Sequence, residues 1–249
     1  MNPIEVSAII FCCVFGGALF GVWLRTVLPQ HHLNADTKEL MKLAVGLIGT
    51  MSALLLGLLV ASAKSSYDQR SGELTQMAAN IILLDRALAH YGPATSDTRG
   101  ILRTAVARMI DQVWSKDKKE DAVPQQTGME VVFDRIQELV PRTEAQHVLQ
   151  SEAESIMINF GQARSLLFAQ SGSSISTPFL VVVVFWLTVL FVSFGLFAPG
   201  NATALATLFV SAISVAAALF LILELDRPFS GVIQISSAPM RNALSAFGH

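Results

Sequence analysis

One cluster of side chains in this 249-residue sequence has the residue types and spacing for ionic chemistry. Glu224 and Asp226 end an apolar stretch and are followed by Arg227, while Lys64 and Arg70 follow another such stretch. Carboxylates at the edge of a hydrocarbon layer are costly unless they are paired or solvated. These carboxylates either pair with the cations or form a cation-binding or gating corner, since carboxylate oxygens suit Ca²⁺.

The other patterns that would indicate catalysis are absent from the sequence. It contains no glycine-rich phosphate loop, nucleophile elbow or zinc-ligand spacing. His31 and His32 have no partner at ligand spacing, and Ser171–Ser176 has the composition of a linker. We therefore expect no catalytic residues, no metal site and no cofactor, and we do not expect an enzyme.

The composition predicts a membrane protein. Apolar residues make up 52% of the chain and charged residues 14%, and the mean hydropathy is +0.53. Soluble domains carry about 25% charged residues. The net charge of −2 gives no reason to expect a nucleic-acid partner. The adjacent Cys12 and Cys13 cannot form a disulfide framework.

Four stretches are long and apolar enough to cross a bilayer as helices, which takes about 20 residues each. They are Ile4–Leu24, Leu43–Ala63, Pro178–Ala198 and Ala202–Leu223. The first is not read as a secretion signal, because no positive side chain precedes it.

The long connection between the second and third spans has a soluble, helical pattern. Its first apolar stripe consists of Leu74, Met77, Ile81, Leu84, Leu88 and Tyr91. These steps of three and four predict that the second helix continues without a break to Tyr91, where Gly92 stops it. Further helices are expected from Ser96 or Asp97, over Glu130–Leu139, and from Pro141 to near Gly172.

The predicted fold is thus an all-α membrane protein with four transmembrane helices and a helical-bundle insert. Four segments follow: helices one and two in residues 1–63, the insert in 64–177, a helical hairpin in 178–223 and a tail in 224–249. More Lys and Arg residues lie near the spans on the insert side than on the other side. Because cytoplasmic loops carry an excess of these residues, we expect the insert and both termini in the cytoplasm. Lys64, Arg70, Arg164, Arg227 and Arg241 lie on that side, against Arg25, Lys38 and Lys42.

The second span has two contrasting faces. A ridge of small residues consists of Gly49, Ala53, Gly57 and Ala61, and the opposite face consists of Leu47, Met51, Leu54, Leu58 and Ser62. The fourth span carries a stripe of hydroxyl groups at Thr203, Thr207, Ser211 and Ser214. Small residues let helices approach closely, so helix packing, without a role in transport, is the plain interpretation of the ridge. For the hydroxyl stripe the plain interpretation is hydrogen bonding between packed helices, and a pore lining is the alternative.

The aromatic residues differ between the spans. The third span is rich in Phe and Trp, and the second contains none. We therefore expect the second and fourth helices to lie inside an assembly and the first and third to face lipid.

The end of the fourth span resembles a family of membrane proteins called bestrophin-like. The resemblance rests on Leu225–Gly231, Ile235–Ser237 with Pro239-Met240, and the second-span exit Gly57–Arg70. It implies a pentameric anion channel whose second helix lines the pore. In that family, aromatic rings on this helix narrow the pore. Here the leucine face is the candidate constriction, and it would gate the pore by excluding water from it.

Two functions follow as hypotheses. The first is a homo-oligomeric ion channel in a bacterial inner membrane, with lipid, ions and copies of itself as partners. The second is a non-conducting membrane scaffold whose cytoplasmic helical domain binds a partner protein. The first requires an assembly with an axial path, and the second does not.

Overall fold

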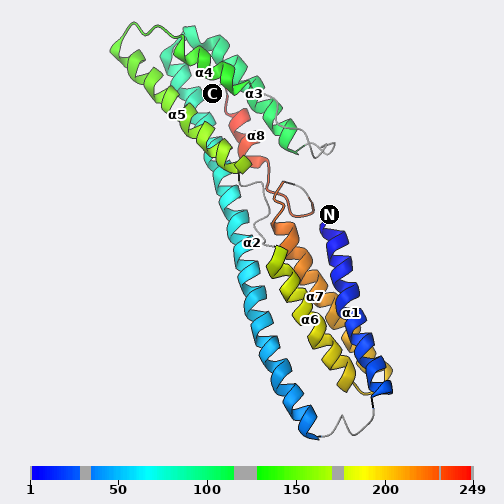
Figure 1. The fold of residues 1–249 in the computed structure, drawn as a ribbon. Coiled ribbons are helices and arrows are strands. Elements are labelled where there is room, and N and C mark those ends of the chain that lie inside the picture. Colours follow the sequence, from blue (N-terminus) through cyan, green and yellow to red (C-terminus); the bar gives the residue numbers. More distant parts are fainter. Residues whose placement is uncertain (1, 29–34, 115–127, 170–176, 230, 248–249) are drawn as a thin grey trace. The chain divides into compact units, whose positions relative to one another are not determined.

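The computed structural model describes residues 2–28, 35–114, 128–169, 177–229 and 231–247 (Figure 1). Within these ranges all regular structure is helical. The helices are α1 (Pro3–Val27), α2 (Ala35–Tyr91), η2 (Pro93–Thr95), α3 (Ser96–Trp114), α4 (Met129–Gln137), α5 (Glu144–Ala169), α6 (Thr177–Phe197), α7 (Ala202–Leu225) and α8 (Ala238–Ser245). His31, His32 and the linker Ser171–Ser176 lie outside the described residues.

Four of the described helices are long and apolar enough to cross a membrane, as predicted: α1, α2, α6 and α7. Their starts follow local capping. Asn2 accepts a hydrogen bond from the backbone N–H of Ile4, and Glu5 accepts one from the backbone N–H of Asn2, which forms a capping box before α1. Asn201 caps α7 by accepting from the N–H of Ala204 at 2.9 Å.

The prediction that the second helix runs unbroken to Tyr91 is confirmed. α2 is 57 residues long and stops at Gly92, whose φ of 119° only glycine adopts readily. The apolar stripe of its outer half, Leu74 to Tyr91, is buried throughout. The 3.6-residue period of that stripe therefore identified a real packing face.

The start of α5 differs from the prediction. The helix begins at Glu144 rather than Pro141, because Thr143 supplies the cap: its hydroxyl accepts from the N–H of Gln146, at 3.2 Å. The proline lies outside the helix, three residues before it. Side-chain capping decided this boundary, rather than the preference of proline for the first helical turn.

The chain divides into two compact units. The first comprises Met1–Tyr67 with Ser173–Ile233, and the second comprises Asp68–Gly172 with Gln234–His249. The boundary in the C-terminal tail therefore falls between Ile233 and Gln234.

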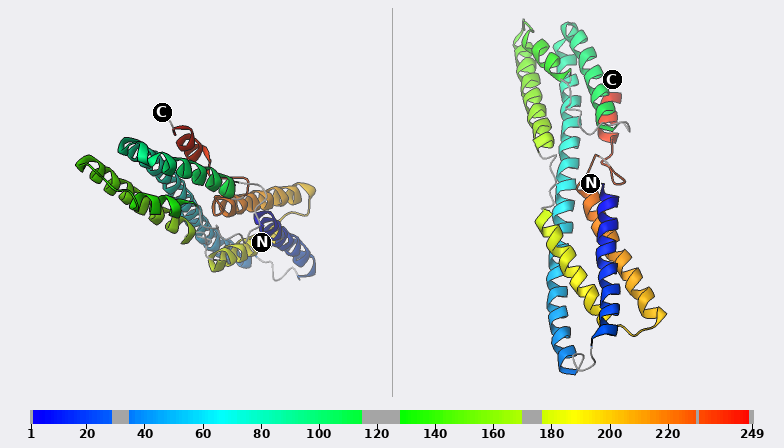
Figure 2. Two further views of the ribbon diagram at one scale, coloured as in Figure 1. Left: turned by 90° about the horizontal axis from the view of Figure 1, so that it is seen from above. Right: turned by 45° about the vertical axis from the view of Figure 1, so that its right-hand side comes forward.

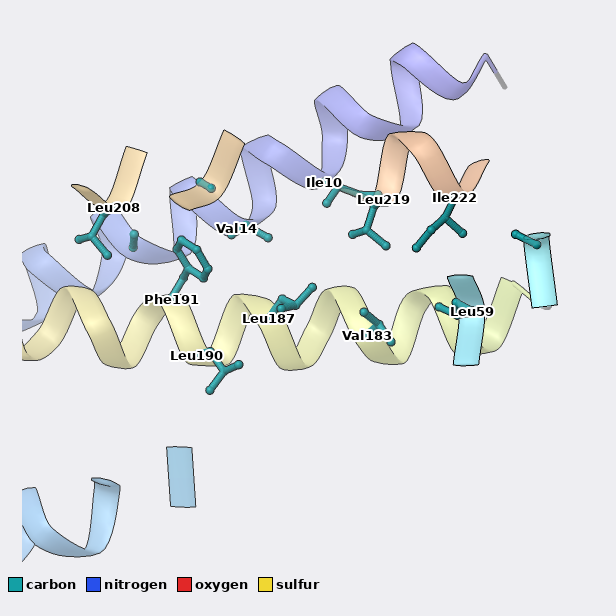
Figure 3. Close-up of a cluster of buried hydrophobic side chains, with 13 residues drawn as sticks. Ile10, Val14, Leu59, Val183, Leu187, Leu190, Phe191, Leu208, Leu219 and Ile222 are labelled. Atoms are coloured by element: carbon teal, nitrogen blue, oxygen red, sulfur yellow. The ribbon is translucent and has the colours of Figure 1, made fainter. Parts of the chain in front are cut away.

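The core of the first unit lies where α1 packs against α6 and α7 (Figures 1 and 2). Val183 and Leu187 of α6 point towards Ile10 of α1 and Leu219 of α7, as Figure 3 shows. The inner half of α2 adds Leu59 and Ala63 to this cluster. The expectation that the first and third spans face lipid therefore misses their main contact, which is with each other.

Glycine makes the contact between α1 and α6 possible. Gly17 and Gly21 on α1, and Gly195 on α6, lie so close to the facing helix that a Cβ at any of them would collide with it. The spacing Gly17-x-x-x-Gly21 is the signal for such an approach in the sequence. The prediction for these spans rested on their aromatic residues and not on their glycines, so it did not include this contact.

The second unit is a helical bundle fastened by polar side chains. Asp85 of α2 forms two hydrogen bonds with the guanidinium of Arg99 on α3, at 2.6 and 2.9 Å. The Nε2 of Gln146 on α5 donates to the carbonyl of Tyr91, and the Nε2 of Gln150 donates to that of Ile136. These two glutamines, one turn apart, therefore satisfy the carboxyl ends of α2 and α4.

Candidate functional site

The inner half of α2 has three faces, of which one packs against its own chain. That face consists of Val45, Ile48, Ser52, Leu55, Leu56, Leu59 and Ala63. Its members recur at intervals of three and four, as one side of a helix requires. Leu59, Ala63 and Ser52 are buried, whereas the other members are partly buried.

Within the part of the chain that the structure describes, the predicted leucine face of α2 is uncovered. Leu54 is 75% exposed, and Leu47, Met51 and Leu58 are also exposed, while Ser62 is half-buried. At 100° per residue this face lies about 120° around the helix from the face that packs on its own chain. It is a row of large apolar side chains that the described elements of the chain leave exposed.

The small ridge of α2 is uncovered as well. Ala53, Gly57 and Ala61 are exposed, Gly49 is half-buried, and a Cβ added at Gly49 or Gly57 would meet nothing within 4 Å. The ridge lies about 120° from each of the other two faces. Only 11% of the most apolar stretch of α2 is buried, against 39% for α6.

Two hydroxyl groups of the stripe on α7 donate hydrogen bonds within their own helix. The hydroxyl of Thr207 donates to the carbonyl of Thr203, and that of Ser214 donates to the carbonyl of Val210, each at 2.9 Å. Thr203, Thr207 and Ser214 are exposed, and Ser211 is half-buried. The hydroxyls of Thr207 and Ser214 therefore satisfy their donors without a neighbouring helix, and α7 packs through Leu208, Ala212 and Leu219 instead.

The residues of the predicted charged corner are divided between the two units. Lys64, Glu224, Asp226 and Arg227 belong to the first unit, and Arg70 belongs to the second. Lys64 is exposed, with its Nζ 5.6 Å from the centroid of the Tyr67 ring, a cation–π contact. Arg70, Glu224 and Asp226 are buried.

Glu224 has a structural partner that the sequence did not indicate. Its side chain is 2% exposed, and its Oε2 accepts hydrogen bonds from the backbone N–H groups of Val232 at 2.6 Å and Ile233 at 3.4 Å. The chain reverses direction after α7 to bring these groups back. The carboxylate thus fastens the tail to the end of the last long helix.

Gly231 makes this reversal possible. Its φ is +100°, and a Cβ there would lie 3.0 Å from the carboxylate carbon of Glu224. Any other residue would therefore be strained in the backbone and would press on the carboxylate. This contact gives a physical role to the glycine that closes the Leu225–Gly231 motif.

The described residues do not form a metal centre. No group of three or more His, Cys, Asp or Glu side chains among them is placed to hold an ion. A Ca²⁺ site takes six to eight oxygen ligands, and at this corner the Oε2 of Glu224 is engaged by backbone N–H groups. The arrangement fits a structural carboxylate.

Comparison with known proteins gives one match. The Bestrophin-like domain matches residues 12–240, from the first turns of α1 into α8. Searches of curated proteins and of solved structures find no match. The matched range covers α2, α6 and α7 in full, α1 from Cys12 onwards, and the contact between Glu224 and the tail.

Proposed function

The chain belongs to the Bestrophin-like domain family, and from this premise we propose that it is a homo-oligomeric ion channel whose pore is lined by α2. It is a multi-pass membrane protein, with four helices able to span the bilayer. In the proposed assembly, α2 helices from several copies surround a common axis. Five copies is the number that the family likeness favours, and anions are the favoured permeant class.

The observation that carries this proposal is the pair of uncovered faces on α2. One face already packs on its own chain, so the other two are free to contact other copies. In a ring of α2 helices, the small ridge at Gly49, Ala53, Gly57 and Ala61 would contact the neighbouring copy. The leucine face would then point towards the axis.

The leucine face supplies a gate in this arrangement. Rings of Leu47, Met51, Leu54 and Leu58 side chains form a narrow apolar stretch from which water withdraws when the radius is small. Ser62 and Lys64 follow towards the insert, where the pore widens into polar surroundings. We place the insert and both termini in the cytoplasm, from the distribution of Lys and Arg.

Reconstitution into planar bilayers tests the proposal. Wild type is expected to conduct, and Leu54→Ser with Leu58→Ser is expected to raise the open fraction because hydroxyls hold water in the constriction. Leu221→Ser, at an exposed leucine of α7, is the matched control and should leave the current unchanged. No current from either wild type or the double variant, with the protein inserted, would overturn the channel.

The scaffold remains the second candidate, favoured by exposed apolar side chains on the second unit. Val140, Val148 and Ile158 are exposed there, as a surface for a partner protein would require. A stoichiometric soluble partner, recovered with the full chain and lost on deleting residues 74–169, would support it. If the protein is a scaffold, it should also carry no current when it is reconstituted into planar bilayers.

A further inference from the structure

We propose that Arg25, near the end of α1, binds the phosphate group of an anionic phospholipid at the membrane surface where α6 turns into α7. The site lies wholly within the first unit. It consists of the Arg25 guanidinium and the turn to which that guanidinium is bound. The proposal requires a membrane but no conduction, so it is independent of the channel.

The length of α1 places Arg25 among the lipid headgroups. The 25 residues of this helix span about 37 Å at 1.5 Å each, which exceeds the hydrocarbon core of about 30 Å. Arg25 lies in the last turn of the helix, and a guanidinium is costly within hydrocarbon. The nearby Phe20 and Trp23 rings have their centroids 5.6 Å apart and are more than half exposed, as is typical of aromatic residues at a membrane surface.

A contact with the chain after α6 holds the Arg25 side chain in place. Its Nη1 donates a hydrogen bond to the backbone carbonyl of Ala198, 173 positions further along the chain. The end of α1 and the turn between α6 and α7 accordingly lie at the same end of the first unit (Figure 1). A side chain that is already fixed loses less conformational entropy when it binds a ligand. Because a guanidinium has five N–H donors, it can bind a phosphate while one donor remains on Ala198.

The surrounding helices contain no charge that neutralises Arg25. It is the only Asp, Glu, Lys or Arg between positions 6 and 35, and residues 178–223, nearly all of α6 and α7, contain none. Glu39 is the first carboxylate of α2 whose side chain the structure describes, and it is exposed and makes no hydrogen bond or ion pair with Arg25. The exposed Arg25 cation is therefore complementary to an anionic phosphate, which supplies the missing counter-charge.

Thermal unfolding of the detergent-extracted full chain with added lipid tests the site. Phosphatidylglycerol is expected to raise the melting temperature of wild type by about 3 °C more than the same amount of phosphatidylcholine, because only the first lipid has a net negative charge. Arg25→Gln should lose this difference, and Arg25→Lys, which keeps the charge without the planar fork, should retain part of it. Arg103→Gln, at an exposed arginine of the second unit, is the control and should keep the full difference.

Lipid retention gives a second measurement that does not depend on stability. Native mass spectrometry should find phosphatidylglycerol bound to wild type, and Arg25→Gln should bind it about tenfold more weakly. Inorganic phosphate should not reproduce the gain in melting temperature, since it has no acyl chains to lie along the apolar helices. An equal gain from inorganic phosphate would overturn the assignment to a lipid. Equal gains from the two lipids in wild type, or an undiminished difference in Arg25→Gln, would overturn the site itself.

Discussion

Gly195 on α6 lies directly against the backbone carbonyl of Ala18 on α1, and a Cβ at position 195 would stand 3.0 Å from that carbonyl carbon. The neighbouring atom is backbone, so it cannot rotate aside as a side chain would. This contact fixes how closely the first and third membrane helices approach, and it leads to the first prediction.

Gly195→Ala should destabilise the first unit by about 2 kcal/mol, because the added methyl group forces the two helices apart. Thermal unfolding in detergent measures the loss. Gly16→Ala is the matched control on α1, where a Cβ would meet nothing within 4 Å and stability should not fall. Equal melting of the two variants would contradict the close packing.

The small ridge of α2 should be needed for assembly and not for the fold of one chain. Gly57→Leu is expected to leave helix content and monomer stability intact, since nothing of the same chain lies within 4 Å of its Cβ position. The same change should break the oligomer, because a bulky side chain prevents close approach of helices. Native mass spectrometry of the detergent-extracted protein reports the subunit number.

Gly16→Leu, on an exposed and equally open position of α1, is the control for the ridge. It should preserve the oligomer seen in wild type. An unchanged oligomer in Gly57→Leu would remove the ridge from the interface and, with it, the proposed position of α2 around an axis.

The leucine face should be reachable from water in an open channel. In a background with Cys12→Ser and Cys13→Ser, Leu54→Cys is expected to react with a charged thiol reagent and to change the current, because a pore-facing thiol is solvated. Val181→Cys, on an exposed position of α6, should not react when that helix faces lipid. Equal reaction at both positions would argue against a pore along α2.

The ion pair between Asp85 and Arg99 should stabilise the helical bundle. The side chain of Asp85 is 7% exposed, so Asp85→Ala leaves the Arg99 guanidinium without its bidentate partner and should cost about 2 kcal/mol. Glu138→Ala, which breaks the exposed pair with Arg135, should cost less than about 0.5 kcal/mol. Chemical denaturation followed by circular dichroism compares the two.

The pH dependence of this pair follows from Arg99. The hydrogen bond to Asp85 raises the pKa of Arg99 above its ordinary value, against an opposing effect of burial. A cation whose pKa is raised on folding contributes stability below its unfolded pKa and loses it as the pH rises through the folded value. Titration of Arg99 should therefore not weaken the bundle between pH 5 and 9.

Much of the helical layout was visible in local patterns. The four membrane spans follow from runs of apolar residues that only a bilayer or a large core can accept. The unbroken course of α2 follows from a stripe with no breaker before Gly92. The predicted start of a helix was less accurate where a side-chain cap and a proline both indicated a first residue, as at Thr143 before α5.

The partners of individual side chains were not visible. Glu224 was expected either to pair with cations or to bind one, and the backbone N–H groups that it accepts from come from a chain reversal eight residues later. The glycine contact of α1 with α6 joins residues more than 170 positions apart. The spacing of residues along the chain shows which of them share one face of a helix. It does not show which distant segment that face will contact in the folded protein.

By itself the sequence determined that this is an all-helical membrane protein with four long apolar helices, because hydrophobic length and helical period are local properties of the chain. The tertiary structure alone decided which face of each helix its own chain covers. On α2 it covered the Ser52 and Leu59 face and left the leucine face and the small ridge open. Burial is a property of what lies opposite a side chain, and that is set only when distant segments pack together.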